Sequence, residues 1–142
     1  RIESVPVEIV YVRSEEGPDG AVARNLLDGD PSTIWHTMYS ITVPKYPHWI
    51  DFDCGEQRLL KGFSYMPRQD GSANGNIKAY KIEVSNDGQT WGDIVAQGEF
   101  DNSRKVKKVL FDKPCKARFV RFTALSSQDG QDFASGAEMT FF

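Results

Sequence analysis

Apolar and polar residues alternate along several short segments of the chain, with the period of two that is typical of half-buried β-strands. Residues 80–84 read Tyr-Lys-Ile-Glu-Val, and residues 50–54 read Ile-Asp-Phe-Asp-Cys. The segments are separated by sequences rich in glycine, proline, asparagine and aspartate, which favour turns. We therefore predict strands at residues 7–12, 50–54, 63–65, 80–84, 106–111, 118–123 and 138–142.

The same pattern predicts an all-β fold. No stretch of ten or more residues carries an apolar stripe of helical period, and residues 25–27 are expected to form a single turn at most. About seven to nine short strands, with no helices to cover a parallel sheet, predict an antiparallel β-sandwich. Three segments are too long for hairpins, residues 13–34, 37–47 and 67–77. Binding residues usually lie on such long ordered loops.

Length and composition are those of one globular domain. The chain has 142 residues, of which 39% are hydrophobic and 26% are charged. A chain of this length buries roughly 70% of its unfolded surface. It shows no linker and no repeat, so we expect a single module over residues 1–142. The chain begins at Arg1 without an apolar leader, which favours a piece of a larger multi-domain protein.

The formal net charge of −3 narrows the classes of partner. Sequence-independent binding to nucleic acid requires a basic surface that displaces counterions, so we expect no nucleic-acid partner. An anionic membrane is disfavoured for the same reason, because each nearby Lys or Arg contributes about 1 kcal/mol. No apolar run is long enough to span a bilayer.

The two cysteines, Cys54 and Cys115, could form one disulfide, but the sequence does not establish that their geometry allows it. Both lie in apolar, strand-like surroundings. Cysteine is among the most buried residue types even when it is free. We favour two thiols and leave the disulfide open.

Oxygen-bearing side chains are concentrated at residues 28–33, which read Asp-Gly-Asp-Pro-Ser-Thr. Calcium takes six to eight oxygens from carboxylates, hydroxyls and carbonyls. The EF-hand spacing is excluded, because its glycine position holds Thr33 and its bidentate glutamate position holds Tyr39. Further ligands would have to come from elsewhere, with Glu138 as a candidate. Asp-Gly-Asp-Pro is also a common turn sequence, in which Asp caps the turn and Gly adopts a positive φ, so the spacing alone leaves both interpretations open.

A second group of candidates combines aromatic rings with planar polar side chains. His36 and Tyr39 follow the acidic loop, Arg68 opens a loop rich in glycine and amides, and Phe133 lies in a polar segment near the end. A sugar ring stacks one apolar face on an aromatic ring, and its hydroxyls pair with Arg, Asn or His. The alternative is that the aromatic residues only pack loops and that Arg68 is a turn-capping surface charge.

Signatures of catalysis are missing from the sequence. It contains only two histidines, His36 and His48, with no Gly-x-Ser-x-Gly and no His-Glu-x-x-His motif. Its 20 acidic residues leave a glycosidase-like pair open by composition, but most of them occupy alternating strand positions. Residues 85–91 are one residue short of a sialidase Asp-box, so we predict a hairpin turn with a buried Trp91. We expect no enzyme.

Six segments, taken in order, resemble the discoidin or coagulation factor 5/8 type C domains, and among them carbohydrate-binding module family 32. These segments are residues 27–37, 47–55, 65–70, 80–91, 117–121 and 134–138. Their order matches the family from about residue 7 to the end, so the resemblance covers nearly the whole chain. It implies a discoidin-like jelly-roll sandwich.

The resemblance implies a structural calcium ion that pins the first loop to the last strand. The family binds this ion through a carbonyl, an acid-x-acid-x-x-Thr sequence and an Ala-Glu pair near the C-terminus. The ligands implied here are the Asn25 carbonyl, Asp28, Asp30, Thr33, the Ala137 carbonyl and Glu138.

The resemblance also implies a sugar site. Relatives that bind galactose or N-acetylhexosamines use a His with an aromatic residue three positions on, an Arg, an Asn and an aromatic residue from a C-terminal loop. The matching residues are His36, Tyr39, Arg68, Asn74 and Phe133, with Asn76 as an alternative to Asn74. This sequence departs from many relatives by having tyrosine instead of tryptophan at position 39, and Cys54 instead of leucine.

The function implied by this family is a non-catalytic module that binds terminal galactose, GalNAc or GlcNAc. It would target an attached glycoside hydrolase to glycans. We expect a monomer, from a bacterial protein that is secreted, at the cell surface or periplasmic. The alternative is an adhesion domain that binds protein or phospholipid. Lipid-binding relatives expose apolar side chains ringed by basic ones, whereas the long loops at 13–34 and 67–77 are rich in glycine, asparagine and aspartate.

Overall fold

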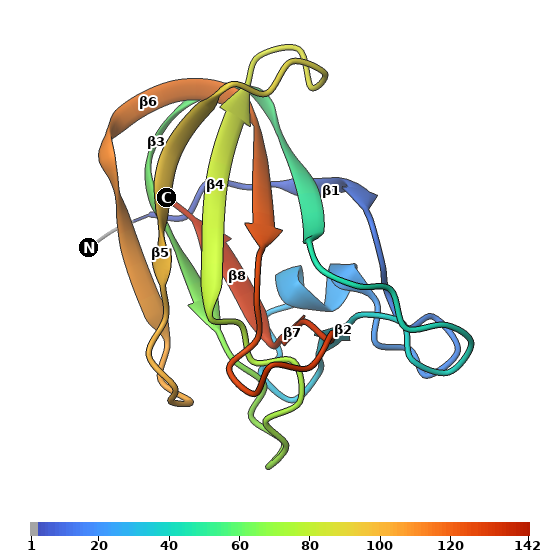
Figure 1. Ribbon diagram of the computed structural model, residues 1–142. Helices are drawn as coiled ribbons and strands as arrows, with labels where there is room; N and C mark the ends of the chain where they lie inside the picture. The colour runs from blue at the N-terminus through green and yellow to red at the C-terminus, as the bar shows by residue number, and fades with distance from the viewer. Residues whose placement is uncertain (1–2) are drawn as a thin grey trace.

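The computed structural model describes residues 3–142, and within that range the chain forms eight β-strands and one short 3-10 helix (Figure 1). No helix in this range is long and apolar enough to cross a bilayer. The elements are β1 (Glu8–Val12), η1 (Ala23–Leu27), β2 (Trp35–His36), β3 (His48–Met66), β4 (Ala79–Ser85), β5 (Asp93–Glu99), β6 (Lys107–Ala124), β7 (Ser135–Gly136) and β8 (Glu138–Phe141).

Two strands are longer than the alternation predicts. The strands expected at 50–54 and 63–65 are both parts of β3, and those expected at 106–111 and 118–123 lie almost entirely in β6. β3 and β6 pair along their length, but their register shifts between Asp53 and Arg58 and again between Leu60 and Gly62. Such irregularities bend a strand without ending it, so the polar interruption in the sequence is a bend and not a turn.

The bends fold the sheet into two antiparallel layers. In one layer, the first half of β3 pairs with β1 and with the second half of β6, which continues to β4 and β5. In the other, the second half of β3 pairs with β8 and with the first half of β6. Figure 1 shows β6 rising along one side, bending over the top and descending beside β4. The predicted antiparallel sandwich is confirmed.

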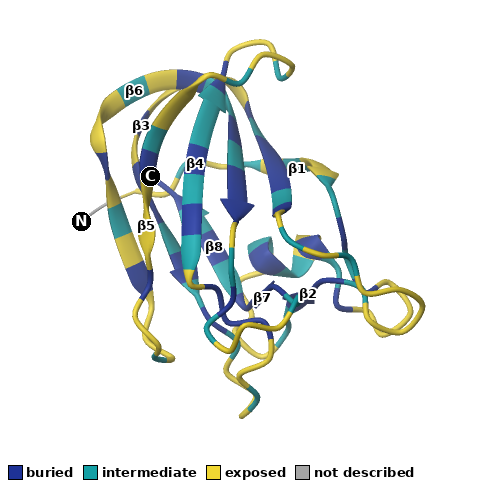
Figure 2. Cartoon of the chain, in the orientation of Figure 1, coloured by how far each residue is buried: buried dark blue, intermediate teal, exposed yellow. Residues whose placement is uncertain are grey.

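The space between the layers is filled mainly by aromatic rings. Phe52, Phe63, Phe122 and Phe141 are fully buried, and the centroids of Phe52 and Phe141 lie 4.9 Å apart. Each such ring buries about 150–250 Å². Along β4 the buried and less buried residues alternate, as Figure 2 shows. The apolar positions of the alternation that predicted this strand therefore face the core, and the polar positions face the surface.

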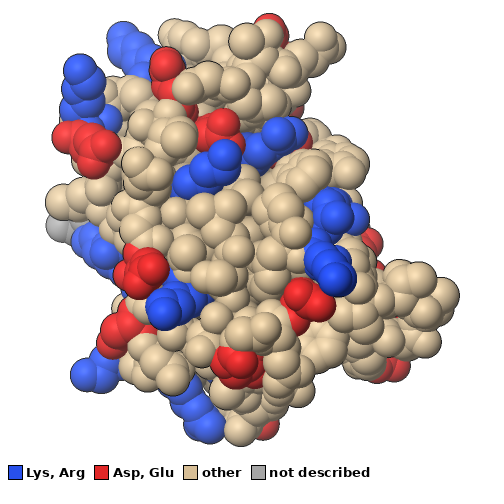
Figure 3. All heavy atoms as spheres, in the orientation of Figure 1, with Lys and Arg blue, Asp and Glu red and all other residues tan. Residues whose placement is uncertain are grey.

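The outer surface carries charges of both signs, which are interspersed on the face seen in Figure 3. Arg121 Nε lies 2.7 Å from Asp51 Oδ1, and Arg118 Nε lies 2.8 Å from Asp53 Oδ1. Both pairs are bidentate and join β3 to β6. In each pair the carboxylate neutralises the charge of its arginine.

The hairpin predicted at residues 85–91 joins β4 to β5. The Asp87 carboxylate accepts the N–H groups of Gln89 and Thr90, at 2.9 and 2.8 Å. The prediction that Trp91 is buried is wrong, because its ring is only partly buried. It lies on the outer face with the guanidinium of Arg121 4.5 Å from its centroid. A cation over the ring face provides a favourable partner outside the core.

Both cysteines are free thiols in the structure, as the sequence favoured. Cys54 is buried, and this burial raises the pKa of its thiol to about 11. Cys115 is half-buried and lies opposite Leu60 on the neighbouring strand. The two thiols therefore occupy separate positions in the sheet.

Candidate functional site

A depression of about 240 Å³ opens at the end of the sandwich where the long loops meet. It is lined by Ala21, Ile34, His36, Tyr39, Arg68, Asn74 and Phe133. The five residues assigned to a sugar site from the sequence therefore surround one depression, although they come from three separate segments of the chain.

A two-stranded ladder forms the support beneath this depression. β2 pairs with β7, so that His36 lies opposite Ser135. The buried Tyr65 hydroxyl donates to the Ser135 carbonyl at 2.8 Å, and the Ser135 hydroxyl donates to the Asn74 carbonyl at 2.7 Å. The Ser135 hydroxyl thus links the loop at 67–77 to β7, and the Tyr65 hydroxyl links β7 to the core.

The imidazole of His36 is buried and has a defined tautomer. Its Nδ1 lies 2.6 Å from the Thr37 carbonyl, so Nδ1 carries the proton and donates it. Nε2 is left as an acceptor. The rings of Tyr39 and Phe133 lie 5.0 and 5.2 Å from the imidazole, centroid to centroid. Burial, together with the charge of Arg68, lowers the pKa of His36 below its ordinary value.

Arg68 is held in one orientation by its neighbours. Its Nε and Nη2 donate to the two oxygens of Asp70 at 2.8 and 2.7 Å, and its Nη1 donates to the Asn74 carbonyl at 3.1 Å. Only 11% of the arginine side chain is exposed. The arginine holds the pKa of Asp70 below its ordinary value. Three of the five N–H donors of a guanidinium are thereby used, and two remain.

The structure separates the two asparagines that the sequence left as alternatives. Asn74 lines the depression and is exposed, whereas Asn76 is buried beneath it. Gly75 between them has a φ of +85°, and a Cβ there would lie 2.7 Å from the Ser135 hydroxyl oxygen. This close approach requires glycine, and it turns Asn74 outward.

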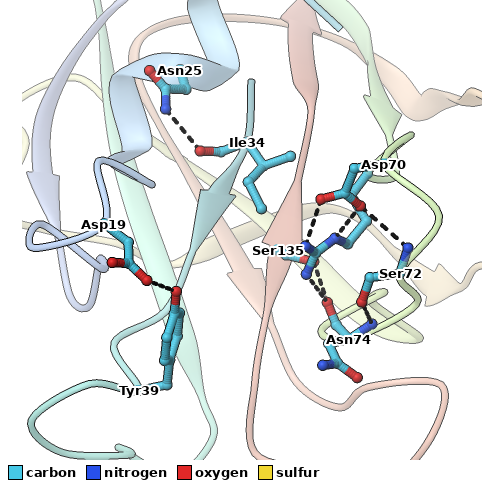
Figure 4. Close-up of polar contacts among 9 residues, drawn as sticks. Asp19, Asn25, Ile34, Tyr39, Asp70, Ser72, Asn74 and Ser135 are labelled. Carbon is cyan, nitrogen blue, oxygen red and sulfur yellow. Dashed lines mark hydrogen bonds and ion pairs between the residues drawn. The ribbon is translucent and has the colours of Figure 1, made fainter. Parts of the chain in front are cut away.

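Tyr39 is held in the wall of the depression by two acidic residues of an earlier loop. The buried Glu16 carboxylate accepts the N–H groups of Tyr39 and Ser40 at 2.9 and 2.8 Å, and the Ser40 hydroxyl at 2.8 Å. These donors lower the pKa of Glu16. The Tyr39 hydroxyl donates to Asp19, as Figure 4 shows. Loop 13–34 therefore fixes both the backbone and the ring of Tyr39.

Replacing Glu16 with glutamine is expected to weaken sugar binding by about tenfold, because an amide cannot accept from all three donors. The Tyr39 and Ser40 amide protons should lose their charged acceptor and move upfield in ¹H–¹⁵N spectra. Glu56→Gln, at an exposed carboxylate on β3, should change neither quantity. Unchanged amide shifts in Glu16→Gln would show that the carboxylate does not hold this loop.

Phe133 reaches the depression on a loop that is tied to the middle of the chain. The Tyr46 hydroxyl donates to the Phe133 carbonyl, and the buried His48 donates from Nε2 to the Asp132 carbonyl at 2.7 Å. His48 Nδ1 accepts from Arg13 at 3.1 Å. The aromatic residue is therefore presented from an ordered loop.

Several residues around the depression were missed by reasoning from the sequence. Ala21 and Ile34 add apolar surface, while Glu16, Asp19 and Asp70 orient the side chains that line it. Only Asp70 carried a signal, since it lies two residues after Arg68 in a turn-rich loop. The others act across contacts between separate loops.

The predicted metal ligands lie between η1 and the start of β8. The Asn25 carbonyl accepts the Asp28 N–H at 3.4 Å, and the Asp28 carboxylate accepts the Thr33 hydroxyl at 2.5 Å and the Asp30 N–H at 2.9 Å. Within residues 3–142, no three His, Cys, Asp or Glu side chains are drawn together tightly enough to hold an ion by themselves. A cation here would need the hydroxyl and carbonyl oxygens as well as the acids.

The donor set fits a hard cation. Glu138 Oε2 is buried and has no hydrogen-bond partner among the described residues. Burial and the nearby charges of Asp28 and Asp30 raise the pKa of Glu138. A buried carboxylate oxygen among like charges is costly unless a cation or a donor satisfies it.

Asn25 connects this region to the depression. Its side-chain amide donates to the Ile34 carbonyl at 2.8 Å (Figure 4), and also to the Gly20 carbonyl at 2.9 Å. Ile34 lines the depression, and Gly20 follows Asp19 in the chain. The acidic loop and the wall of the depression are therefore parts of one hydrogen-bonded unit.

Two wider grooves, of about 840 and 800 Å³, lie along β1 with η1 and between β5 and β6. The first is lined mainly by aliphatic residues, and the second mainly by residues of β5 and β6, Cys115 among them. The first has a single aromatic residue, Tyr11, and the second has none, whereas the smaller depression combines two aromatic rings with an imidazole, a guanidinium and an amide. The smaller depression has the chemistry of a specific site.

A rigid antiparallel sandwich that gathers aromatic and hydrogen-bonding side chains on its loops is the architecture of a small binding module. The F5/8 type C domain profile matches residues 10–139. The chain belongs to the F5/8 type C domain family, as the sequence motifs predicted.

The chain is similar in sequence to a sialidase, and in sequence and structure to modules that were solved with bound sugars. A sialidase of Micromonospora viridifaciens is 38% identical over 141 residues, which cover 97% of this chain and 21% of the sialidase. The chain thus spans about a fifth of that relative's length. The Clostridium perfringens module CpGH89CBM32-5, solved with GalNAc-β-1,3-galactose, is 32% identical with a TM-score of 0.87, covering 99% of both chains. The family 32 module of C. perfringens NanJ, solved with galactose, is 30% identical with a TM-score of 0.82, covering 97% of this chain and 96% of that one.

Proposed function

We propose that this chain is a non-catalytic module that binds a terminal galactose or N-acetylhexosamine residue and directs an attached glycoside hydrolase to glycans. The observation that carries the proposal is the depression around His36, Arg68 and Asn74. It offers one acceptor, two free guanidinium donors and an amide beside two aromatic rings. Two structural neighbours were solved with galactose-containing ligands.

The arrangement suits a pyranose with vicinal hydroxyls. His36 Nε2 accepts one hydroxyl, while Arg68 donates to the next and Asn74 both donates and accepts. The faces of Tyr39 and Phe133 provide apolar surface for the sugar C–H groups. The site is shallow and holds one residue, so we expect a dissociation constant of about 0.1–1 mM.

Isothermal titration calorimetry tests this function. The protein, in saturating calcium, is titrated with galactose, GalNAc and GlcNAc, and with glucose as the control. We expect saturable binding to at least one of the first three and none to glucose. Absence of heat with all of them would reject the sugar assignment and leave the adhesion-domain alternative.

We also propose a structural calcium ion held by the Asn25 and Ala137 carbonyls, Asp28, Asp30, Thr33 and Glu138. What supports it is the orphaned oxygen of Glu138 beside two further carboxylates. Bound calcium would supply charge neutralisation and join the loop after η1 to β8. The module would belong to a protein that is secreted, at the cell surface or periplasmic, where calcium is abundant.

Sugar affinity is expected to fall at acidic pH. The neutral form of His36 is the acceptor, and its pKa lies below the ordinary 6.5. Affinity should therefore be constant from pH 8 to 6.5 and decline as the pH drops further, through the lowered pKa. Calorimetry across this range, in saturating calcium, measures the profile. His36→Gln should bind more weakly and lose the pH dependence; if it keeps the wild-type profile, another group such as His48 is responsible.

A further inference from the structure

The loop at residues 37–47 exposes apolar side chains beside the depression. Ile41 is 72% exposed, more than any other large apolar residue in the described chain, and Val43 is 46% exposed. Figure 2 shows this loop as an exposed segment that projects from the side of the sandwich. The two side chains lie two positions apart on the loop, so together they form a small exposed apolar surface.

The loop is not free to fold back and cover these side chains. Its first residues are fixed by Glu16, which accepts from Tyr39 and Ser40. Its end is fixed by Tyr46, whose hydroxyl donates to the Phe133 carbonyl. Both anchors are contacts to other loops of the site, so the exposed residues between them are held in place.

The exposed residues continue directly from the wall of the depression. Tyr39 lines the depression and is 42% exposed, and Ile41 and Val43 follow it on the same loop. Lys45 is the single charged residue within 37–47, so the surface that follows Tyr39 offers mainly apolar contact. A group attached to a bound sugar that leaves the depression across Tyr39 would meet this surface.

We infer that Ile41 and Val43 form an apolar ridge that contacts the aglycone of the ligand. The inference rests on the proposed sugar binding and narrows the ligand class to glycosides whose sugar carries an apolar alkyl or acyl group. The sugar occupies the depression, and the apolar group lies on the ridge. Two CH₂ groups removed from water there would strengthen binding by about tenfold.

The test compares methyl β-galactoside with octyl β-galactoside, kept below its micelle concentration, by calorimetry. The octyl glycoside is expected to bind about tenfold more tightly. In the double variant Ile41→Ser/Val43→Ser, methyl galactoside should keep its affinity while the octyl advantage disappears. Leu110→Ser, at a 67% exposed side chain on β6, should keep the advantage.

The outcomes of this test distinguish failure of the ridge from failure of the proposed sugar site. Equal affinities for the two glycosides in wild type, or an octyl advantage that survives in the double variant, would overturn the ridge and leave the proposed function intact. Failure of both glycosides to bind would contradict the proposed function and the ridge together.

Vesicles identify the source of the apolar group. Retention on phosphatidylcholine vesicles that contain galactosylceramide, competed by free galactose, supports a glycolipid. Binding of the octyl galactoside in solution, without retention on these vesicles, supports a soluble alkyl glycoside. Equal binding to plain phosphatidylcholine vesicles, insensitive to galactose, would overturn the inference in favour of a bare membrane.

Discussion

The Arg68→Ala variant is expected to bind its sugar about 100-fold more weakly than wild type, below detection in a calorimetric titration. Two guanidinium donors face no protein acceptor, because Asp70 and the Asn74 carbonyl use the other three. Hydrogen bonds to a charged group contribute about 1.5–3 kcal/mol each. Removing both therefore costs about 3 kcal/mol or more, so the 100-fold loss is the smallest effect we expect.

The variant should remain folded, because its partner Asp70 is 40% exposed and water can solvate the carboxylate. Arg58→Ala is the matched control. Arg58 is 42% exposed, 3.9 Å from Glu56, and belongs to the bend of β3. The Arg58→Ala variant should bind sugar with the affinity of wild type. Arg68→Lys, which keeps the charge but loses the planar fork, should also lose most of the affinity. Wild-type affinity in Arg68→Ala would place the sugar elsewhere.

Withdrawing calcium is expected to lower the melting temperature by about 10 °C. An ion present at 100 times its dissociation constant stabilises the folded state by about 2.7 kcal/mol, and a domain of this size shifts by roughly 3–4 °C per kcal/mol. Calorimetric melting with calcium and with a chelator measures the difference. An unchanged melting temperature would contradict the proposed ion.

Glu138→Gln separates this ion from a general salt effect. Without calcium the variant should be at least as stable as wild type, because the repulsion between Glu138 and the carboxylates of Asp28 and Asp30 is removed. With calcium it should lose most of the gain that wild type shows. Glu99→Gln, at an exposed carboxylate on β5, should respond to calcium like wild type. A full calcium response in Glu138→Gln would exclude this carboxylate as a ligand.

The alternation of residues predicted β1, β4, β8 and the two halves of β3 and of β6, but it missed β2, β5 and β7 and did not show that β3 and β6 are continuous. Period two is a local signal, and β5, with a single buried residue, does not carry it. The bend between Asp53 and Arg58 depends on a register shift against a strand some sixty residues away, and the polar, glycine-containing sequence at 55–58 does not distinguish such a bend from a turn. Trp91 was misplaced for a related reason, since its partner Arg121 lies on another strand.

The candidate site was also predicted only in part from the sequence. Residue chemistry indicated that His36, Arg68 and Phe133 are suited to a sugar, and the family resemblance assigned them to one site. Reasoning from the sequence did not find Glu16, which contacts Tyr39 across 23 positions of the chain. It also left Asn74 and Asn76 open, because the choice depends on the turn at Gly75 and its contact with Ser135.

The most direct test of the central claim is a ¹H–¹⁵N spectrum of the calcium-bound protein titrated with galactose. Because the sugar is proposed to occupy the depression, the amides of His36, Tyr39 and Asn74 should shift together and saturate with one dissociation constant. Residues along β1 and around Cys115, which line the two wider grooves, should stay unchanged. Shifts confined to those grooves, or to no residues when galactose, GalNAc and GlcNAc are all tried, would contradict the account.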